Sequence, residues 1–207
     1  MRSYMNLSLR VPLNTSPEQA AKLIQLQAAF AQACNALAPV VQKTRVWNRV
    51  ALHHMAYKPL REQFPQMGSQ MVCNVIYSVS RHCRLLFQTP QSPFHLAKLG
   101  DKALPLLRFG ETCPVYFDRH TLSLKAGQLS MYTLDGRMRF QLDLKSGDEA
   151  NFHDKKLREI VLSRSIGGGF ELGFLFSDGD DEAAPPGVNL AAELPEYMMV
   201  ETMNESA

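Results

Sequence analysis

Residues 116–142 read YFDRHTLSLKAGQLSMYTLDGRMRFQL, a series of short stretches in which apolar and polar residues alternate. Alternation with a period of two is typical of strands that bury one face. Asp135-Gly136 lies between two of these stretches, and Asp-Gly in that context is a strong signal for a β-hairpin. The segment therefore predicts antiparallel strands joined by tight turns.

The same pattern occurs on both sides of this segment. It is found in VYF, which begins one residue before the segment, and in REIVLSR and FELGFLF after it. Ser146-Gly147 is expected to be a turn between strands. Residues 3–12 also alternate and predict a first strand that ends at Pro12. Because that strand has no sheet partner among the helices predicted after it, we expect it to join the later strands.

Helical periodicity replaces this pattern after the first strand. Thr15 or Ser16 is the expected N-cap, followed by Pro17 at the first helical position. Apolar residues then continue at helical spacing to about Asn35.

Two more helices are predicted, at about 46–64 and about 68–87. Pro59 should kink or divide the first of them, because proline removes a hydrogen bond inside a helix. Residues 94–110 form a loosely patterned connector.

These patterns predict an α+β fold. Residues 1–13 and 104–176 would form a small antiparallel, OB-like β-barrel, and residues 14–103 a helical bundle inserted after its first strand. Residues 177–207 are predicted to be an acidic, disordered tail, because SDGDDEAAPPG is charged and carries proline and glycine. An apolar patch at 197–200 would dock on the body or on a partner.

The charge is distributed unevenly along the 207 residues. All 22 Lys and Arg lie within residues 1–164 together with 11 acidic residues, which gives +11, whereas residues 165–207 hold nine acidic residues and no Lys or Arg. A basic body of this kind favours a polyanionic partner. No apolar stretch is long enough to span a membrane, and the N-terminus lacks the apolar run of a signal peptide, so we expect a cytoplasmic protein.

Motifs of common enzymes are absent from the sequence, and we expect no catalytic residue, cofactor or metal. Gly167, Gly168 and Gly169 lie between two predicted strands, so they indicate a hairpin turn rather than a phosphate-binding loop. His53 and His54 are adjacent and would face different sides of a helix, which argues against a shared metal site. The four cysteines are widely spaced and are expected to be buried thiols.

The basic residues form clearer patterns. Arg137 and Arg139 share one face of a predicted strand, while Met138, Phe140 and Leu142 point to the other. A strand that exposes arginine beside aromatic residues favours contact with nucleic acid. The candidate nucleic-acid-binding residues are Arg10, Lys43, Arg45, Arg49, His53, Tyr57, Arg61, Arg81, Arg84, Arg119, Lys125, Arg137 and Arg139.

Three segments resemble the transposon-encoded TnpB (OrfB) RNA-guided nucleases and the related type V CRISPR effectors. They are LRVPLNTSPEQAAKLIQLQAAFAQACNALAPVV, LHHMAYKPLREQF and residues 116–142. The resemblance implies a wedge domain, which is a small barrel interrupted by a helical recognition region. It also implies that the protein binds guide RNA, target DNA or both. It also implies phosphate contacts by Arg10, Arg49, Arg119 and other candidates, with Tyr57 stacking on a base.

The sequence departs from that family where the nuclease domain would begin. The family places an aspartate in a G-[VI]-D-x-G context, whereas the nearest match here is Gly187-Val188-Asn189-Leu190. An amide binds Mg²⁺ more weakly than a carboxylate, and two-metal cleavage needs several anionic ligands. The residues after Asn189 are also too few for that domain. We therefore expect a nuclease-deficient protein, with any nuclease on a separate chain.

A second hypothesis remains open from the sequence. The acidic tail would cover the basic body, and the chain would be a protein-interaction or inhibitory module. Two further alternatives are an inert remnant of a transposon gene and an enzyme of unknown type.

Overall fold

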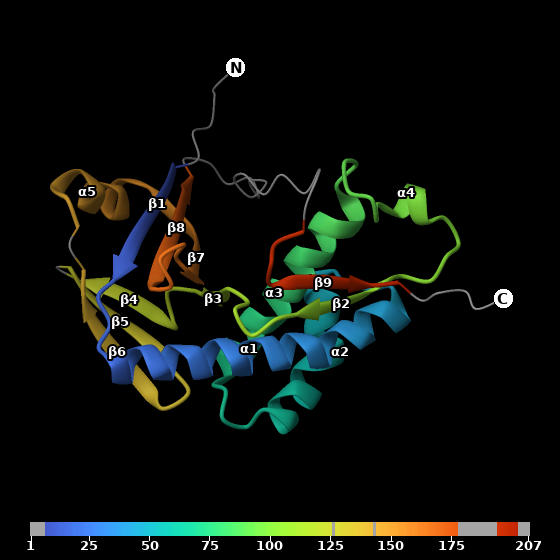
Figure 1. The fold of residues 1–207 in the computed structure, drawn as a ribbon, viewed down its shortest axis with the longest axis horizontal. Coiled ribbons are helices and arrows are strands. Elements are labelled where there is room, and N and C mark those ends of the chain that lie inside the picture. Colours follow the sequence, from blue (N-terminus) through green and yellow to red (C-terminus); the bar gives the residue numbers. More distant parts are fainter. Residues whose placement is uncertain (1–6, 126, 143, 178–193, 203–207) are drawn as a thin grey trace, which may run out of the picture. The chain divides into compact units, whose positions relative to one another are not determined.

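The structure is a computed structural model that describes residues 7–125, 127–142, 144–177 and 194–202. The chain divides into two compact units. The strand unit comprises residues 1–25 and 114–188, and the helical unit comprises residues 26–113 and 189–207. The predicted α+β class is confirmed by the helices and antiparallel sheets (Figure 1).

The strand unit holds two antiparallel sheets. One has the order β1-β8-β7-β3 and the other the order β4-β5-β6. Their strands are β1 (Leu7–Leu13), β3 (Val115–Phe117), β4 (Leu122–Lys125), β5 (Gln128–Thr133), β6 (Gly136–Gln141), β7 (Lys156–Arg164) and β8 (Phe170–Ser177). Among the described residues these strands form separate open sheets and no closed barrel.

The first strand joins the later ones, as predicted. β1 pairs antiparallel with β8 from Leu7 opposite Phe176 to Leu13 opposite Phe170. Pro12 does not end the strand, because β1 is an edge of its sheet and an edge strand tolerates a residue without an N–H donor. The sheet therefore brings together segments that are more than 150 residues apart in the sequence.

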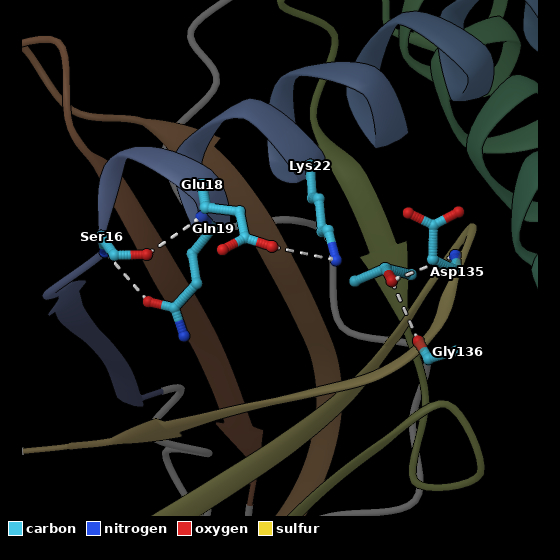
Figure 2. A network of polar contacts seen from close by, with 7 residues as sticks. Ser16, Glu18, Gln19, Lys22, Asp135 and Gly136 are labelled. Atoms are coloured by element: carbon cyan, nitrogen blue, oxygen red, sulfur yellow. Dashed lines mark hydrogen bonds and ion pairs between the residues drawn. The ribbon is translucent and has the colours of Figure 1, made fainter.

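The predicted hairpin at Asp135-Gly136 connects β5 and β6. Thr133 pairs with Gly136, so that Leu134 and Asp135 form the turn. Gly136 has a φ of +105°, a conformation that favours glycine. The Thr133 hydroxyl donates to the Gly136 carbonyl at 2.9 Å and accepts from the Asp135 N–H (Figure 2).

Of two other turns predicted at glycines, one is confirmed and one is wrong. Gly167 to Gly169 form the tight turn between β7 and β8, as predicted, and Gly168 has a φ of +83°. The turn expected at Ser146-Gly147 is wrong. Helix α5 (Ser146–Asp154) begins there, with Asp148 and Glu149 in its first turn, where carboxylates interact favourably with the helix dipole.

Helix α1 (Pro17–Thr44) begins with a capping box. The Gln19 N–H donates to the Ser16 hydroxyl at 3.1 Å, and the Ser16 N–H donates to Oε1 of Gln19 at 3.0 Å (Figure 2). Ser16 is therefore the N-cap. The helix continues about two and a half turns beyond the predicted end near Asn35 and passes through Pro39.

The helical unit is built around α3 (Ser69–Gln88), which buries most of its residues. Helix α2 (Arg49–Gln63) continues through Pro59 and is not divided there, since Leu52, Ala56 and Leu60 hold its inner face in the core. The unit also contains α4 (Leu96–Leu99) and a two-stranded sheet of β2 (Leu106–Phe109) and β9 (Met198–Glu201).

The helical unit extends further than the sequence patterns predicted. Residues 104–113 belong to it rather than to the strands, because β2 pairs with β9 and not with a strand of the strand unit. The apolar patch at 197–200 docks on the body through this pairing. Disorder was predicted for the whole of 177–207, but residues 198–201 form a strand, and residues 178–193 lie outside the described part of the chain.

Within the described part of the chain, no helix combines the length and the apolar character needed to cross a membrane.

Candidate nucleic-acid interface

The strand register gives the sheet β4-β5-β6 two different faces. Residues directly opposite each other on paired strands share a face, so the pairs Leu124–Leu129 and Leu129–Phe140 define an apolar inner face. Leu129 and Phe140 are buried. The alternate positions form the outer face.

We call this outer face the basic sheet face. Its eight residues are Ser123, Lys125, Gln128, Ser130, Tyr132, Arg137, Arg139 and Gln141. Three of them are cationic, one is aromatic, four are neutral and polar, and none is acidic. The predicted alternation of Arg137 and Arg139 with Met138 and Phe140 is confirmed, because the arginines are exposed and the apolar side chains are buried.

Arg137 is held in place on this face. Its guanidinium lies 4.1 Å from the centre of the Tyr132 ring, within the range of a cation–π contact. Its Nη1 donates to the Ser130 hydroxyl at 3.2 Å, and its Nη2 donates to the His120 carbonyl at 3.3 Å. Tyr132 remains 43% exposed. The pair therefore presents an ordered flat cation beside an accessible aromatic ring.

Arg139 lies one pair of residues further along the same strand, opposite Ser130. Its backbone carbonyl accepts a hydrogen bond from Nε2 of Gln19 at 3.2 Å, which connects β6 to the first turn of α1. The capping box thus positions a side chain that supports the basic sheet face.

Lys125 and Arg119 also border a cavity of about 560 Å³ in the strand unit. Leu122, Ile160 and Phe174 are buried in its apolar lining. Both cations are exposed. These two cations extend the positively charged surface from the basic sheet face to the edge formed by β4.

A second cluster of candidates lies on α2 in the helical unit. Arg49, His53 and Tyr57 are four residues apart and share one face of the helix. The His53 and Tyr57 rings stack at 4.7 Å with an interplanar angle of 21°. The Arg49 guanidinium lies 5.2 Å from the centre of the Tyr77 ring. We call these three residues of α2 the helical patch.

Four other candidates lie outside these two clusters, and three of them have local structural roles. Arg45 ends α1 in the left-handed conformation, with a φ of +57°, and donates to the Lys102 carbonyl. Arg10 forms an ion pair with Glu171 at 3.0 Å. Lys43 is exposed in the last turn of α1. Arg61 is partly buried and donates to the Met67 carbonyl.

The two candidates on α3 differ in their exposure to solvent. Arg81 is only 9% exposed, so the prediction that it contacts phosphate is not supported by its position. The reason is that α3 is the central helix of its unit and is covered on several sides. Arg84 is partly exposed.

The neighbouring His82 is buried with a lowered pKa of about 4, because burial penalises the imidazolium. Its Nδ1 lies 2.7 Å from the Ser78 carbonyl oxygen, which can only accept, so Nδ1 carries the proton. Nε2 lies 3.1 Å from the Tyr197 hydroxyl and accepts its hydrogen bond. This neutral histidine supports the position of β9.

The thiols have no feature of a reactive site. Cys34, Cys83 and Cys113 are buried, and Cys73 is partly buried. Burial raises the pKa of Cys83 to about 12 and raises that of Cys34 as well. A thiol that stays protonated is a poor nucleophile. Within the described ranges, no group of three or more His, Cys, Asp or Glu side chains is placed to hold a metal ion.

The sequence patterns missed Tyr132 and Tyr77 as members of these clusters. Tyr132 could have been found, because period-two alternation places it on the same face as Ser130. Tyr77 carried no signal, since only the packing of α3 against α2 brings it to Arg49.

Comparison of the chain with models of known protein families gives no match, and comparison with curated proteins gives none.

Proposed function

We propose that this protein binds nucleic acid through the basic sheet face, with the helical patch as a second contact. One observation carries the proposal: eight outward positions on three adjacent strands include three cations and an aromatic ring but no acidic residue. Cations bind phosphate and aromatic or guanidinium planes stack on bases, so this face suits a single strand or an A-form backbone.

The proposed role is that of a nuclease-deficient, TnpB-like subunit that grips guide RNA, target DNA or both. The order of one strand, helices and then the strands that pair with it supports this role, since it is the order implied by the resemblance. In this proposal the strand unit corresponds to a wedge barrel, and base pairing reads the target sequence. A separate chain would supply any nuclease activity, and the complex would act in the cytoplasm. The match at 187–190 lies outside the described residues.

Binding is tested by fluorescence anisotropy with a labelled 20-nucleotide RNA, an RNA duplex and a DNA duplex. A charged contact with phosphate contributes about 1 kcal/mol or more, so the double variant Arg137→Glu, Arg139→Glu should bind RNA at least about tenfold more weakly. Lys145→Glu is the matched control, because it makes the same kind of charge change at an exposed residue outside the candidate surfaces. It should lose little affinity.

A loss of binding free energy for the double variant only twice as large as that for Lys145→Glu would show that only overall charge matters, because the double variant changes the charge twice as much. No binding of any of the three probes would exclude the proposal. The guide-RNA role is tested separately by sequencing the RNA that copurifies with the protein: one recurrent structured RNA supports it, and random cellular RNA contradicts it.

One contact favours the alternative function, in which the acidic tail masks the basic body. Arg108 Nε lies 3.1 Å from Oε1 of Glu201, so a tail carboxylate does pair with a cation of the body. Changing Asp178, Asp180, Asp181 and Glu182 to their amides removes tail charge and leaves β9 unchanged. Masking predicts a clear rise in RNA affinity. Unchanged affinity would contradict it.

A further inference from the structure

Strand β9 binds to the helical unit mainly as an added edge strand. Its residues Met198 to Glu201 pair antiparallel with Phe109 to Leu106 of β2 (Figure 1). The Gly110 N–H donates to the Tyr197 carbonyl at 2.7 Å, which extends the pairing by one residue. Backbone pairing of this kind gives affinity for any extended segment, and side-chain pockets decide which segment fits.

The first side-chain pocket recognises a tyrosine. Tyr197 places its hydroxyl 3.1 Å from Nε2 of the buried His82, and its ring lies edge-on to the imidazole with centroids 5.7 Å apart. The tautomer of His82 is set by the Ser78 carbonyl, so Nε2 needs a donor. Phenylalanine would fill the same space but leave this buried acceptor without the tyrosine hydroxyl.

Two more positions discriminate between segments. Met198 is 3% exposed and pairs with the buried Phe109, whereas the next residue, Met199, is 60% exposed. Glu201 pairs with Arg108. The groove thus reads a tyrosine, an apolar residue, an exposed position of low selectivity, a partly buried apolar residue opposite Leu107, and an acidic residue.

We propose that the edge of β2 is a docking groove for an extended segment of a partner protein with this pattern, and that β9 is the chain's own competitor for it. Residues 178–197 separate β9 from β8, so the strand is attached through a connection of 20 residues. A tethered strand acts at an effective concentration on the order of millimolar, and a partner segment must compete with it. This inference is independent of nucleic-acid binding.

The replacement of β9 by another segment is tested with the full chain. A specific protease site is placed within residues 183–189. After cleavage, β9 is no longer tethered, and a fluorescent peptide of residues 194–202, LPEYMMVET, serves as the probe. We expect saturable peptide binding to the cleaved protein and much weaker binding to the uncut protein. Fluorescence of Trp47, the only tryptophan, reports whether the helical unit stays folded after cleavage.

The pattern is tested with peptide variants. Replacing the tyrosine by phenylalanine should weaken binding about tenfold, since a buried acceptor loses its donor. A peptide with Glu201→Lys should bind several-fold more weakly to the wild-type groove and better than the original peptide to the Arg108→Glu protein. Such a reversed preference is not expected of nonspecific binding.

Two results would overturn the inference. One is failure of the peptide to bind cleaved protein from which the β9 fragment has been removed, while Trp47 fluorescence remains native. The other is equal binding of the original, phenylalanine and scrambled peptides, which would show that the groove reads no side chain.

Discussion

Single residues in this protein have distinct electrostatic environments. His82 is neutral because burial lowers its pKa, and two hydrogen bonds then assign a role to each ring nitrogen. Arg137 is exposed, yet a ring and two hydrogen-bond acceptors hold its guanidinium in one orientation. The first arrangement supports the fold, and the second belongs to the surface that we propose for binding.

The buried His82 should make stability depend on pH. Its pKa is about 4 in the folded protein against an ordinary value of 6.5, so the folded state binds fewer protons between these values. Stability should therefore fall as the pH drops from about 6.5 to 4, by up to about 3 kcal/mol, with no further loss from this group below pH 4. Urea unfolding followed by Trp47 fluorescence measures the effect.

The variant His82→Gln should lose this part of the pH dependence, whereas the exposed His53→Gln should retain it. Equal pH dependence in wild type and His82→Gln would contradict the assignment of a lowered pKa to His82.

Tyr132 should contribute to binding without contributing charge. Tyr132→Ala removes the ring on which Arg137 lies, and stacking on a base is worth about 1–3 kcal/mol, so affinity for single-stranded RNA should fall about tenfold. Tyr132→Phe keeps the ring and should bind nearly as well. A loss of the same size in both variants would exclude stacking as the cause.

At the scale of elements, the hairpin between β5 and β6 determines which side chains reach the basic sheet face. A shift of one residue in its register would turn Arg137 and Arg139 inward and expose Met138 and Phe140. Gly136 maintains this register, because its positive φ allows the strand to begin directly after the turn. The capping box of α1 adds support from the Gln19 side chain to Arg139.

Gly136→Ala isolates the role of this backbone conformation. No atom lies within 4 Å of the position that a Cβ would occupy, so the substitution acts through the φ of +105° alone. It should destabilise the strand unit by about 1–2 kcal/mol. Gly167 also has free space for a Cβ but does not have a positive φ, so Gly167→Ala should lower the stability of the strand unit less. Urea unfolding followed by far-UV circular dichroism compares them, and equal costs would contradict the argument.

On the scale of the whole molecule, charge is separated along the chain. The first 164 residues carry +11, and the nine acidic residues within 165–207 return the total to +2. Each phosphate neutralised on a single strand contributes about 0.7 to the slope of log K against log salt concentration. In the proposed function, the overall charge would steer nucleic acid toward the protein, while the number of direct contacts would set this slope.

The salt slope should therefore count the contacts on the basic sheet face. Arg137→Glu, Arg139→Glu should lower the magnitude of the slope by about 1.4 for single-stranded RNA, if each arginine contacts one phosphate. Tyr132→Phe should leave the slope unchanged. Anisotropy titrations between 50 and 300 mM salt would measure both, and an unchanged slope in the double variant would place the phosphate contacts elsewhere.

Local patterns were sufficient for much of the secondary structure and for the outward side of β6. The Ser16 cap, the three long helices, the Asp135-Gly136 hairpin and the alternation around Arg137 follow from backbone preferences and periodicity over a few residues. The pairing of the first strand with a late one also followed, because no nearer partner was available.

Only the tertiary structure decided how β9 pairs with β2, that Arg81 is buried and that Tyr77 meets Arg49. It also replaced the expected turn at Ser146-Gly147 by a helix and left the described strands in open sheets. These features depend on contacts between segments that are far apart in sequence. Periodicity reports which face of an element is apolar, but it does not report which other element covers that face.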